Sequence, residues 1–345
     1  MVPRKSDCSS DSNTHVSVHW LLPSELTLKQ LHATNLASVR LRAAVAADAF
    51  HDCNIALSTG GNISDFCRVV IVGKIGADNV EIRSRSWIAG IANAKKRGAI
   101  IVIDYTDHHL GQQSTMQEFY RRSFEYADIV IVPSRAMQDN LQAFWRGQIA
   151  VIPDAIEYKV RAPLRRAGEL PTALWFGHPS NLEYLVQFLQ YASLEMVLKA
   201  LVICTDARGI NWIQSNPKYF GRLHITPALW TVQALEKLSC ECDLALLPTG
   251  LNDPRKSGAS ENRLITAIAL GLPVVTHSLS SYEPYRKYYS DINGDDYMAV
   301  IKNPTGMHNL VLAAQKQIVP KYYPHTVGLT WRDFILKCVE SRLVL

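Results

Sequence analysis

The sequence lacks any apolar run of the roughly 20 residues that a helix needs to cross a membrane. Residues 1–14 are polar and without the apolar centre of a signal peptide, so we expect a disordered tail and no export. The seven cysteines include no CxxC pair, which fits a reducing compartment and argues against structural zinc. We therefore expect a cytoplasmic protein with no bound metal or cofactor.

The chain has only a small excess of positive over negative charge. Lys and Arg number 36 and Asp and Glu 31, which gives a formal net charge of +5 over 345 residues. No basic run is interleaved with aromatic residues, so the sequence does not indicate a nucleic-acid partner. The excess is compatible with an anionic substrate, an anionic membrane surface or solubility alone. For peripheral contact with a membrane we consider Arg161, Arg165 and Arg166, which a solvated linker explains equally well.

What the chain does contain is a regular alternation of strand and helix patterns. Hydrophobic residues make up 48% of it, enough for two domains with cores of their own. Strand patterns at 16–22, 54–58, 68–72, 100–104, 129–133 and 149–153 alternate with helical patterns at 36–50, 86–96, 116–126 and 135–145. Because these strands are continuous apolar runs joined by helical crossovers, we expect a parallel sheet with helices on both faces.

A break at residues 157–171, rich in arginine, proline and glycine, precedes a second half of the same design. Strand patterns return at 172–176, 199–204, 223–225, 244–248 and 273–276, with helical patterns at 181–191, 231–240, after Ser260, and at 331–341. The predicted fold is α/β, with two Rossmann-like domains, 15–156 and 172–324, facing a central cleft. Residues 325–345 would form a helix leading back toward the first domain.

The most informative segment, residues 256–275, has a polar basic loop, a short helix and a buried strand. Ser260 suits the N-cap, Gly271 the C′ position, and Pro273 prevents continuation of the helix. At the helix N-terminus the unpaired N–H groups and the dipole favour an anion. The polar residues expected there are Lys256, Ser257, Asn262 and Arg263. Such a set suits a diphosphate better than a single carboxylate, although solvated cations on a connecting loop would give the same pattern.

Four segments in order, 127–141, 149–156, 242–248 and 267–275, resemble the glycosyltransferases of family 4, which have the GT-B fold. The resemblance covers nearly the whole chain after residue 14. It implies a transferase whose C-terminal domain holds a nucleoside-diphosphate-sugar donor and whose N-terminal domain holds a glycan or glycolipid acceptor. It also implies metal independence and retention at the anomeric carbon.

The resemblance gives roles to particular residues. Lys256 and Arg263 would stabilise the leaving diphosphate as its charge develops. The expected donor contacts are Lys256, Ser257, Glu261, Asn262, Arg263, Thr266 and Thr205. The family's two glutamates, eight residues apart, fall on Gly258 and Thr266, so the donor contacts differ from the family pattern. Thr266 would fill part of the second glutamate's role at the ribose, and Glu261 would approach from the previous turn.

A second group of candidates follows the strand pattern at 100–104, where side chains should face the cleft. Asp107 and His108 are the foremost candidates for contact with the acceptor or the transferring sugar, and both are predicted catalytic residues. A capped turn with solvated histidines or a metal site would give the same spacing. The predicted acceptor contacts are Ser38, Arg40, Asp104 and His109. Because Arg40 and Arg42 point to different faces of the predicted first helix, at most one would serve the site, and a solvated face suits each slightly better.

Two other functions stay open because the family's glutamates are missing. One is a non-catalytic module that binds a glycan or a partner transferase. The other is a nucleotide-sugar epimerase or hydrolase on the same two-domain scaffold. The segment from Gly73 to Gly76 would let the backbone approach a ligand, although a plain turn explains it better. Asp206 is interpreted as a turn cap or a base contact.

Overall fold

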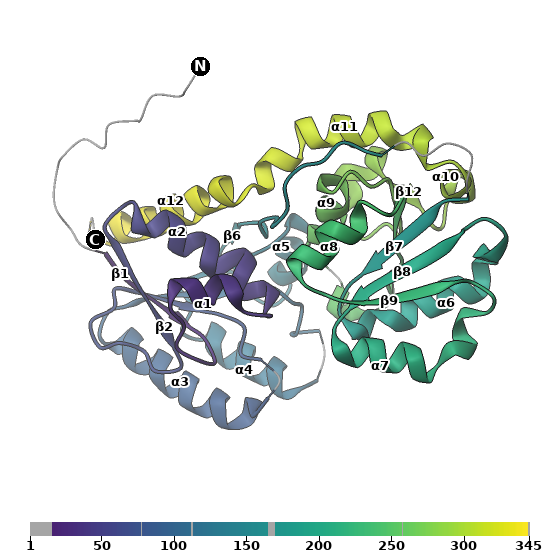
Figure 1. Cartoon of the computed structure of the whole chain (residues 1–345). Coiled ribbons are helices and arrows are strands. Elements are labelled where there is room, and N and C mark those ends of the chain that lie inside the picture. Colours follow the sequence, from purple (N-terminus) through teal and green to yellow (C-terminus); the bar gives the residue numbers. More distant parts are fainter. Residues whose placement is uncertain (1–15, 77, 112, 165–169, 257, 344–345) are drawn as a thin grey trace, which may run out of the picture.

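The computed structural model describes residues 16–76, 78–111, 113–164, 170–256 and 258–343, except for the side chains of Arg255 and Leu343. They form two α/β halves, each built on one parallel sheet of six strands (Figure 1). The predicted fold class is thus confirmed. The predicted tail, together with Arg165, Arg166 and Ser257, lies outside the described residues.

The sheet of the first half has the order β2-β1-β3-β4-β5-β6. Its strands are β1 (Val16–Leu21), β2 (Ile55–Gly60), β3 (Val69–Val72), β4 (Ile100–Asp104), β5 (Ile129–Val132) and β6 (Gln148–Val151). Its helices are α1 (Leu28–Ala33), a π-helix η1 (Val39–Ala44), α2 (Val45–His51), α3 (Val80–Lys96), α4 (Thr115–Phe124) and α5 (Arg135–Gln142). β3, β4 and β5 are buried throughout, which explains their continuous apolar sequences.

The sheet of the second half has the order β12-β11-β10-β7-β8-β9. Its strands are β7 (Thr172–Phe176), β8 (Ala200–Thr205), β9 (Ile225–Leu229), β10 (Leu244–Leu247), β11 (Val274–Thr276) and β12 (Ser290–Asp291). Its α-helices are α6 (Leu182–Ala192), α7 (Ala207–Ser215), α8 (Val232–Ser239), α9 (Asn262–Ala269), α10 (Tyr297–Lys302) and α11 (His308–Gln317). β9 begins two residues later than its pattern predicts and contains Pro227, which an edge strand tolerates.

The last helix, α12 (Pro324–Leu343), runs back across the molecule and packs on α2 of the first half (Figure 1). Its Trp331 and Ile335 are fully buried in the core of that half. The Trp331 and Trp20 ring centroids lie 4.9 Å apart. The C-terminal helix therefore completes the N-terminal core.

Two segments connect the halves, and they lie side by side. The first follows β6, and the second is the single-turn helix η8 (Val319–Tyr322) that precedes α12. The Ile156 amide donates to the Tyr322 carbonyl at 2.9 Å, which joins the two segments. Arg161, considered above for membrane contact, instead donates to Ser239 Oγ and to the Leu270 carbonyl, both at 2.9 Å. Its guanidinium therefore forms hydrogen bonds with the second half.

Candidate functional site

The strand order locates a candidate site at the carboxyl ends of the strands. In the second half, β7 leads to β8 on one side and β10 leads to β11 on the other, so the switch point lies between β7 and β10. Ligands of open parallel sheets bind at such points. The loop after β10 leads into α9, whose N-terminus lies at this edge.

Arg263, in the first turn of α9, is a cation without a carboxylate partner among the described residues. Its Nη2 donates to the Phe176 carbonyl at 2.6 Å, and its guanidinium lies 5.4 Å from the Trp175 ring centroid. Its Nε is buried without a hydrogen-bond partner. Burial lowers the pKa of Arg263, but an arginine stays protonated at neutral pH. A partly buried, uncompensated guanidinium at a helix N-terminus is a ready site for an anion.

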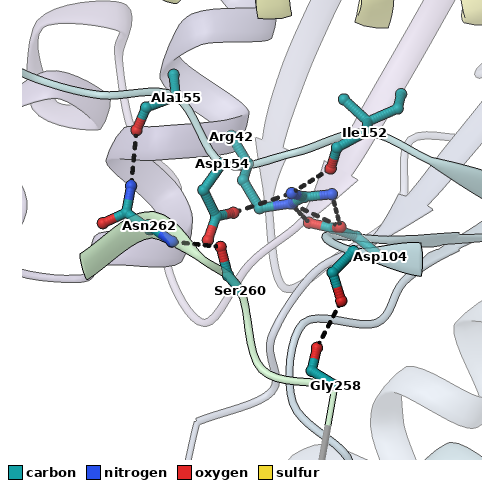
Figure 2. A network of polar contacts seen from close by, with 9 residues as sticks. Arg42, Asp104, Ile152, Asp154, Ala155, Gly258, Ser260 and Asn262 are labelled. Carbon is teal, nitrogen blue, oxygen red and sulfur yellow. Dashed lines mark hydrogen bonds and ion pairs between the residues drawn. The ribbon is translucent and has the colours of Figure 1, made fainter. Parts of the chain in front are cut away.

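The start of α9 differs in detail from the prediction. The helix begins at Asn262, so Glu261 and not Ser260 occupies the N-cap, and the Glu261 side chain makes no capping hydrogen bond. Ser260 Oγ instead accepts from the Asn262 amide at 3.2 Å. Asn262 Nδ2 donates to the Ala155 carbonyl at 3.1 Å, which ties the helix to the connecting segment (Figure 2). Gly271 follows the last helical turn with φ +81°, as its predicted C′ position requires.

Glu261 is a buried carboxyl group with one hydrogen-bonding hydroxyl among the residues that the structure describes. Tyr322 Oη donates to Glu261 Oε1 at 2.6 Å, and Tyr285 Oη contacts Tyr322 Oη in turn. Oε2 is buried without a partner. Burial raises the pKa of Glu261 to about 7, with a further contribution from the Asp154 carboxylate. A glutamate that is about half protonated at pH 7 repels a diphosphate less than a fully ionised one does.

The titration of Glu261 should make the protein less stable as pH rises from about 4.5 to about 7. Its pKa is about 7 in the folded chain against an ordinary 4.5. In this range the folded state holds a proton that the unfolded chain has released. The contribution of the raised Glu261 pKa to the free energy of unfolding is complete below pH 4.5 and lost above pH 7. The difference is about 3 kcal/mol. Urea unfolding at several pH values measures it.

Glu261→Gln provides the control for this titration, because the amide oxygen can still accept from Tyr322. The variant should lose the fall in stability between about pH 4.5 and about pH 7. Equal pH dependence in the variant and the wild type would show that Glu261 does not titrate in this range.

Lys256 ends a short 3₁₀ helix, Pro254–Lys256, in the loop between β10 and α9. Its charge contributes to lowering the pKa values of Asp107 and His178. Asp107 belongs to the first half and His178 follows β7 in the second. Lys256 therefore lies between loops of both halves, as its position in the sequence suggested.

Gly258 lies against the first turn of α5. Its carbonyl accepts from Ser134 Oγ at 2.8 Å, and its φ is +78°. A Cβ at this position would lie 2.6 Å from Met137 Cα. The glutamate of the family pattern that aligns here therefore has no room, because the loop backbone is packed against the other half.

The left-handed conformation costs a residue with a side chain about 1 to 2 kcal/mol. Gly258→Ala should lower the free energy of unfolding by more than this. The excess comes from the contact with Met137, where backbone has to shift. Gly98→Ala is the matched control, since Gly98 also has a positive φ, +89°, and a Cβ there meets nothing within 4 Å. Chemical unfolding of both variants measures the difference, and equal effects would contradict the close packing.

On the first half, Lys74 and Asp107 form an ion pair at the same edge. Lys74 follows β3, Asp107 follows β4, and Lys74 Nζ donates to Asp107 Oδ2. Burial would raise the pKa of Asp107, but the Lys74 ammonium outweighs it and holds this pKa below its ordinary value. His109 Nε2 lies 4.0 Å from Asp107 Oδ2, and the His109 ring stacks on Tyr120. Sequence reasoning missed Lys74, because the glycines on either side of it indicate only a turn.

His108, a predicted catalytic residue, lies in a mostly apolar environment. It is 6% exposed, its ring packs edge-on against Phe144, and its Nδ1 lies 3.4 Å from Tyr105 Oη. Burial lowers the pKa of His108, so a neutral ring is favoured. The alternative of solvated histidines is therefore wrong, since His109 is mostly buried as well.

Asp104 and Arg42 belong to a buried network that holds the connecting segment to the first half (Figure 2). Arg42 Nε donates to Asp104 Oδ1 at 2.8 Å, and its Nη1 donates to Asp154 Oδ1 at 2.9 Å and to the Ile152 carbonyl at 2.8 Å. The Arg42 side chain is 0% exposed and that of Asp104 3%. The solvated face considered for Arg42 is therefore wrong. Asp104 is engaged by Arg42, and we do not include it in the proposed acceptor site.

Arg40 is also buried, so the solvated face considered for it is wrong too. Its Nε donates to Glu157 Oε1 at 2.6 Å, and its guanidinium lies 4.7 Å from the Trp230 ring centroid. Glu157 belongs to the connecting segment and Trp230 to the second half. Arg40 thus bridges the halves, because the π-helix turns both arginines inward. Ser38, just before this helix, is partly exposed and makes no capping hydrogen bond.

Two predicted donor contacts are buried. Thr205 ends β8, is 0% exposed and donates its hydroxyl to the Gly177 carbonyl at 3.0 Å. Thr266 is 3% exposed, one turn inside α9, with Oγ1 3.5 Å from Asn262 Oδ1. Asp206 caps α7 by accepting from the Gly209 amide at 3.0 Å. These contacts support the loops around Arg263.

Comparison with known structures decides the fold. No protein-family model matches the sequence, and no curated protein matches it significantly. An α-glucosyltransferase solved with UDP and a 13-mer DNA matches with a TM-score of 0.63 over 93% of this chain and 99% of its own, at 9% identity. The chain has the GT-B fold. A GT-B assignment agrees with two parallel six-stranded sheets joined by two connecting segments.

Two other structures match with lower TM-scores. TarM, whose Staphylococcus aureus form is solved with UDP, matches at a TM-score of 0.57 and 14% identity over 77% of this chain. That match covers 54% of TarM, so the chain spans about half its length. A Listeria monocytogenes protein assigned as a UDP-N-acetylglucosamine 2-epimerase matches at a TM-score of 0.53 and 10% identity, over 96% of this chain and 97% of its own. The fold therefore accommodates both transferases and an epimerase.

Across the described ranges, no group of three or more His, Cys, Asp or Glu side chains could hold a metal ion. Among the helices of those ranges, none is long and apolar enough to cross a membrane.

Proposed function

We propose that the protein is a glycosyltransferase that moves a sugar from a nucleoside-diphosphate donor to a glycan or glycolipid acceptor. The observation that carries the proposal is Arg263, a cation without a carboxylate partner at the N-terminus of α9. This helix begins at the switch point of a Rossmann-like sheet, where nucleotide phosphates bind in other folds of this class. The neighbouring α-glucosyltransferase, solved with UDP, supports a nucleotide donor.

The proposed donor site centres on the diphosphate. Arg263 and Lys256 would bind its oxygens together with amides of the first turn of α9 other than that of Asn262, which Ser260 Oγ engages. In its protonated form, which burial keeps populated at neutral pH by raising the pKa to about 7, Glu261 would donate its proton to a ribose hydroxyl or a phosphate oxygen. Asn262, Thr266 and Thr205 would support this loop rather than contact the sugar, since their polar atoms have partners within the protein.

The proposed acceptor side is formed by Asp107, His109 and Lys74, at the carboxyl ends of β3 and β4. Asp107 is ionised at neutral pH, because Lys74 holds its pKa down. It would accept a hydrogen bond from a hydroxyl of the acceptor or the transferring sugar and so orient that group. Ser38, partly exposed before the π-helix, would lie at the outer edge of this side.

Retention at the anomeric carbon and metal independence belong to the same proposal. The bond between the anomeric carbon and the diphosphate oxygen breaks, and the acceptor oxygen bonds to that carbon on the same face. The acceptor proton passes to the leaving diphosphate, since Asp107, paired with Lys74, is a weak base. Because Lys256, Arg263 and the α9 N-terminus would stabilise the leaving charge, we expect EDTA to leave the transfer rate unchanged.

The experiment is a thermal-shift screen with UDP, GDP, dTDP, CMP and their common sugars, followed by measurement of donor turnover with and without acceptor glycans. One nucleotide class should stabilise the wild type, and Lys256→Met should weaken that shift. Arg121→Met removes an exposed cation on α4 and should change nothing. Failure of every nucleotide to stabilise the wild type would contradict the proposal.

The second candidate is a nucleotide-sugar epimerase or hydrolase, which the Listeria monocytogenes structure favours. Such an enzyme would turn over the donor without an acceptor. A non-catalytic glycan-binding module, the third possibility, would show no turnover. A transferase requires that acceptor accelerate consumption of the donor, so the same assay separates the three.

A further inference from the structure

A shallow pocket of about 290 Å³ lies at the amino ends of β3 and β4, at the end of the first sheet opposite the proposed transfer site. The loop before β3, the C-terminal end of α3 and the end of α12 surround it. Its lining side chains include Asp65, Phe66, Arg68, Arg97 and Arg342. None of these residues takes part in the proposed function.

Phe66 stands out because its side chain is 90% exposed, more than any other large hydrophobic side chain in the described part of the chain. The backbone around it is well anchored. Ser17 Oγ donates to the Phe66 carbonyl at 2.8 Å, and the Arg68 amide donates to the Ser17 carbonyl at 2.9 Å. The ring is thus held outward by a hydrogen-bonded loop.

The charge around Phe66 is positive. Within the described residues the Arg68 guanidinium makes no hydrogen bond or ion pair, and Arg97 has only Asp65, at 3.5 Å with both side chains well exposed. Arg342 pairs with Asp128 at 2.9 Å. Three arginines and one exposed carboxylate therefore line the pocket beside an exposed aromatic ring.

We propose that this face, which we call the Phe66 face, binds the surface of an anionic lipid bilayer. An aromatic side chain that projects among cations matches the interface, where the ring reaches the acyl boundary and the guanidinium groups pair with lipid phosphates. A single apolar side chain beside arginines suits a headgroup layer better than nucleic acid, which a series of stacking aromatic side chains would bind. The proposal does not depend on the proposed transfer reaction.

Attachment through the Phe66 face would fix the orientation of the protein on the bilayer. The face lies at the amino ends of the strands and the candidate site at their carboxyl ends. A protein bound in this way would therefore turn its transfer site away from the bilayer, toward acceptors that extend from the membrane or lie outside it.

The test is co-sedimentation of the full chain with vesicles of phosphatidylcholine alone and of phosphatidylcholine with phosphatidylglycerol. Only the anionic vesicles should bind the protein, and added salt should release it. Phe66→Ser should lower the partition coefficient about tenfold, whereas Tyr191→Ser, at an exposed aromatic residue of the second half, should not.

The double variant Arg68→Gln/Arg97→Gln should bind about 25-fold more weakly, at about fivefold for each cation removed. Lys302→Gln/Lys316→Gln removes the same charge from the second half and should bind as the wild type does. Equal losses in the two double variants would overturn the proposal in favour of a non-specific charge effect. Absence of binding to anionic vesicles, or binding to a nucleic-acid oligomer alone, would overturn it as well.

Discussion

Arg263→Met should reduce the rate of sugar transfer about 100- to 1,000-fold, the effect of removing one preorganised group that stabilises charge in a transition state. It should not reduce the stability of the free protein. Arg263 has no carboxylate partner among the described residues and is partly buried against Trp175 and Phe176. Burying an uncompensated charge is costly, and methionine fills a similar space without that cost.

A large loss of transfer rate without a loss of stability would show that Arg263 serves ligand binding and not folding. Thermal unfolding without nucleotide and with a saturating nucleotide separates them: the variant should unfold at or above the wild-type temperature alone and lose the nucleotide-induced increase. Arg121→Met, which removes an exposed cation paired with Glu118, controls for the loss of charge. A variant that is unstable on its own but still responds to nucleotide would make Arg263 a structural residue.

Arg42→Met should lower the free energy of unfolding by about 3 to 5 kcal/mol, the usual cost of leaving a buried charge without its partner. Arg42 contacts two carboxylates and a carbonyl and lies 5.2 Å from the Trp331 ring centroid. Burial alone would lower the pKa of Arg42, but the carboxylates of Asp104 and Asp154 raise it. The ion pairs therefore stabilise the charged guanidinium in the core.

Urea unfolding of Arg42→Met, Asp104→Asn and the double variant measures this network. The double variant should lose less free energy of unfolding than the two single variants lose together. Each single change leaves a buried charge without its partner, whereas the double change removes both. Arg121→Met, at a solvent-exposed pair, should cost less than about 1 kcal/mol. Strict additivity would show that Arg42 and Asp104 do not depend on each other.

Much of the fold follows from the sequence because its strands are buried on both faces. Continuous apolar runs such as that of β4 are typical of strands buried on both faces, and the helical crossovers between them require parallel pairing. α7 was missed because its sequence, Ala207–Ser215, contains glycine and asparagine and buries only two residues. Its start is set by the Asp206 cap, a signal that was interpreted as a turn.

The candidate site could be predicted only where it is local in sequence. Arg263 lies in a helix whose start the sequence predicts to within one residue, so its position in the first turn follows from neighbouring residues. Lys74 meets Asp107 across 33 residues and Glu261 meets Tyr322 across 61, and such contacts depend on strand order and on the path of η8. The π-helix misled the assignment of Arg40 and Arg42, because its wider turn changes which side chains point inward.

The return of α12 to the first half bears on the order in which the chain can fold as it is synthesised. Trp20 and Phe50 belong to the N-terminal core, yet Trp331 and Ile335, which pack in the same core, are made almost 300 residues later. Until then the α2 surface that α12 covers remains open to water and to other chains. The first half should therefore depend on chaperones, or aggregate when the chain is cut before α12, while the second half can fold from contiguous sequence. Ribosome-bound chains ending at residue 323 and at residue 345, compared by proteolysis, would reveal this delay.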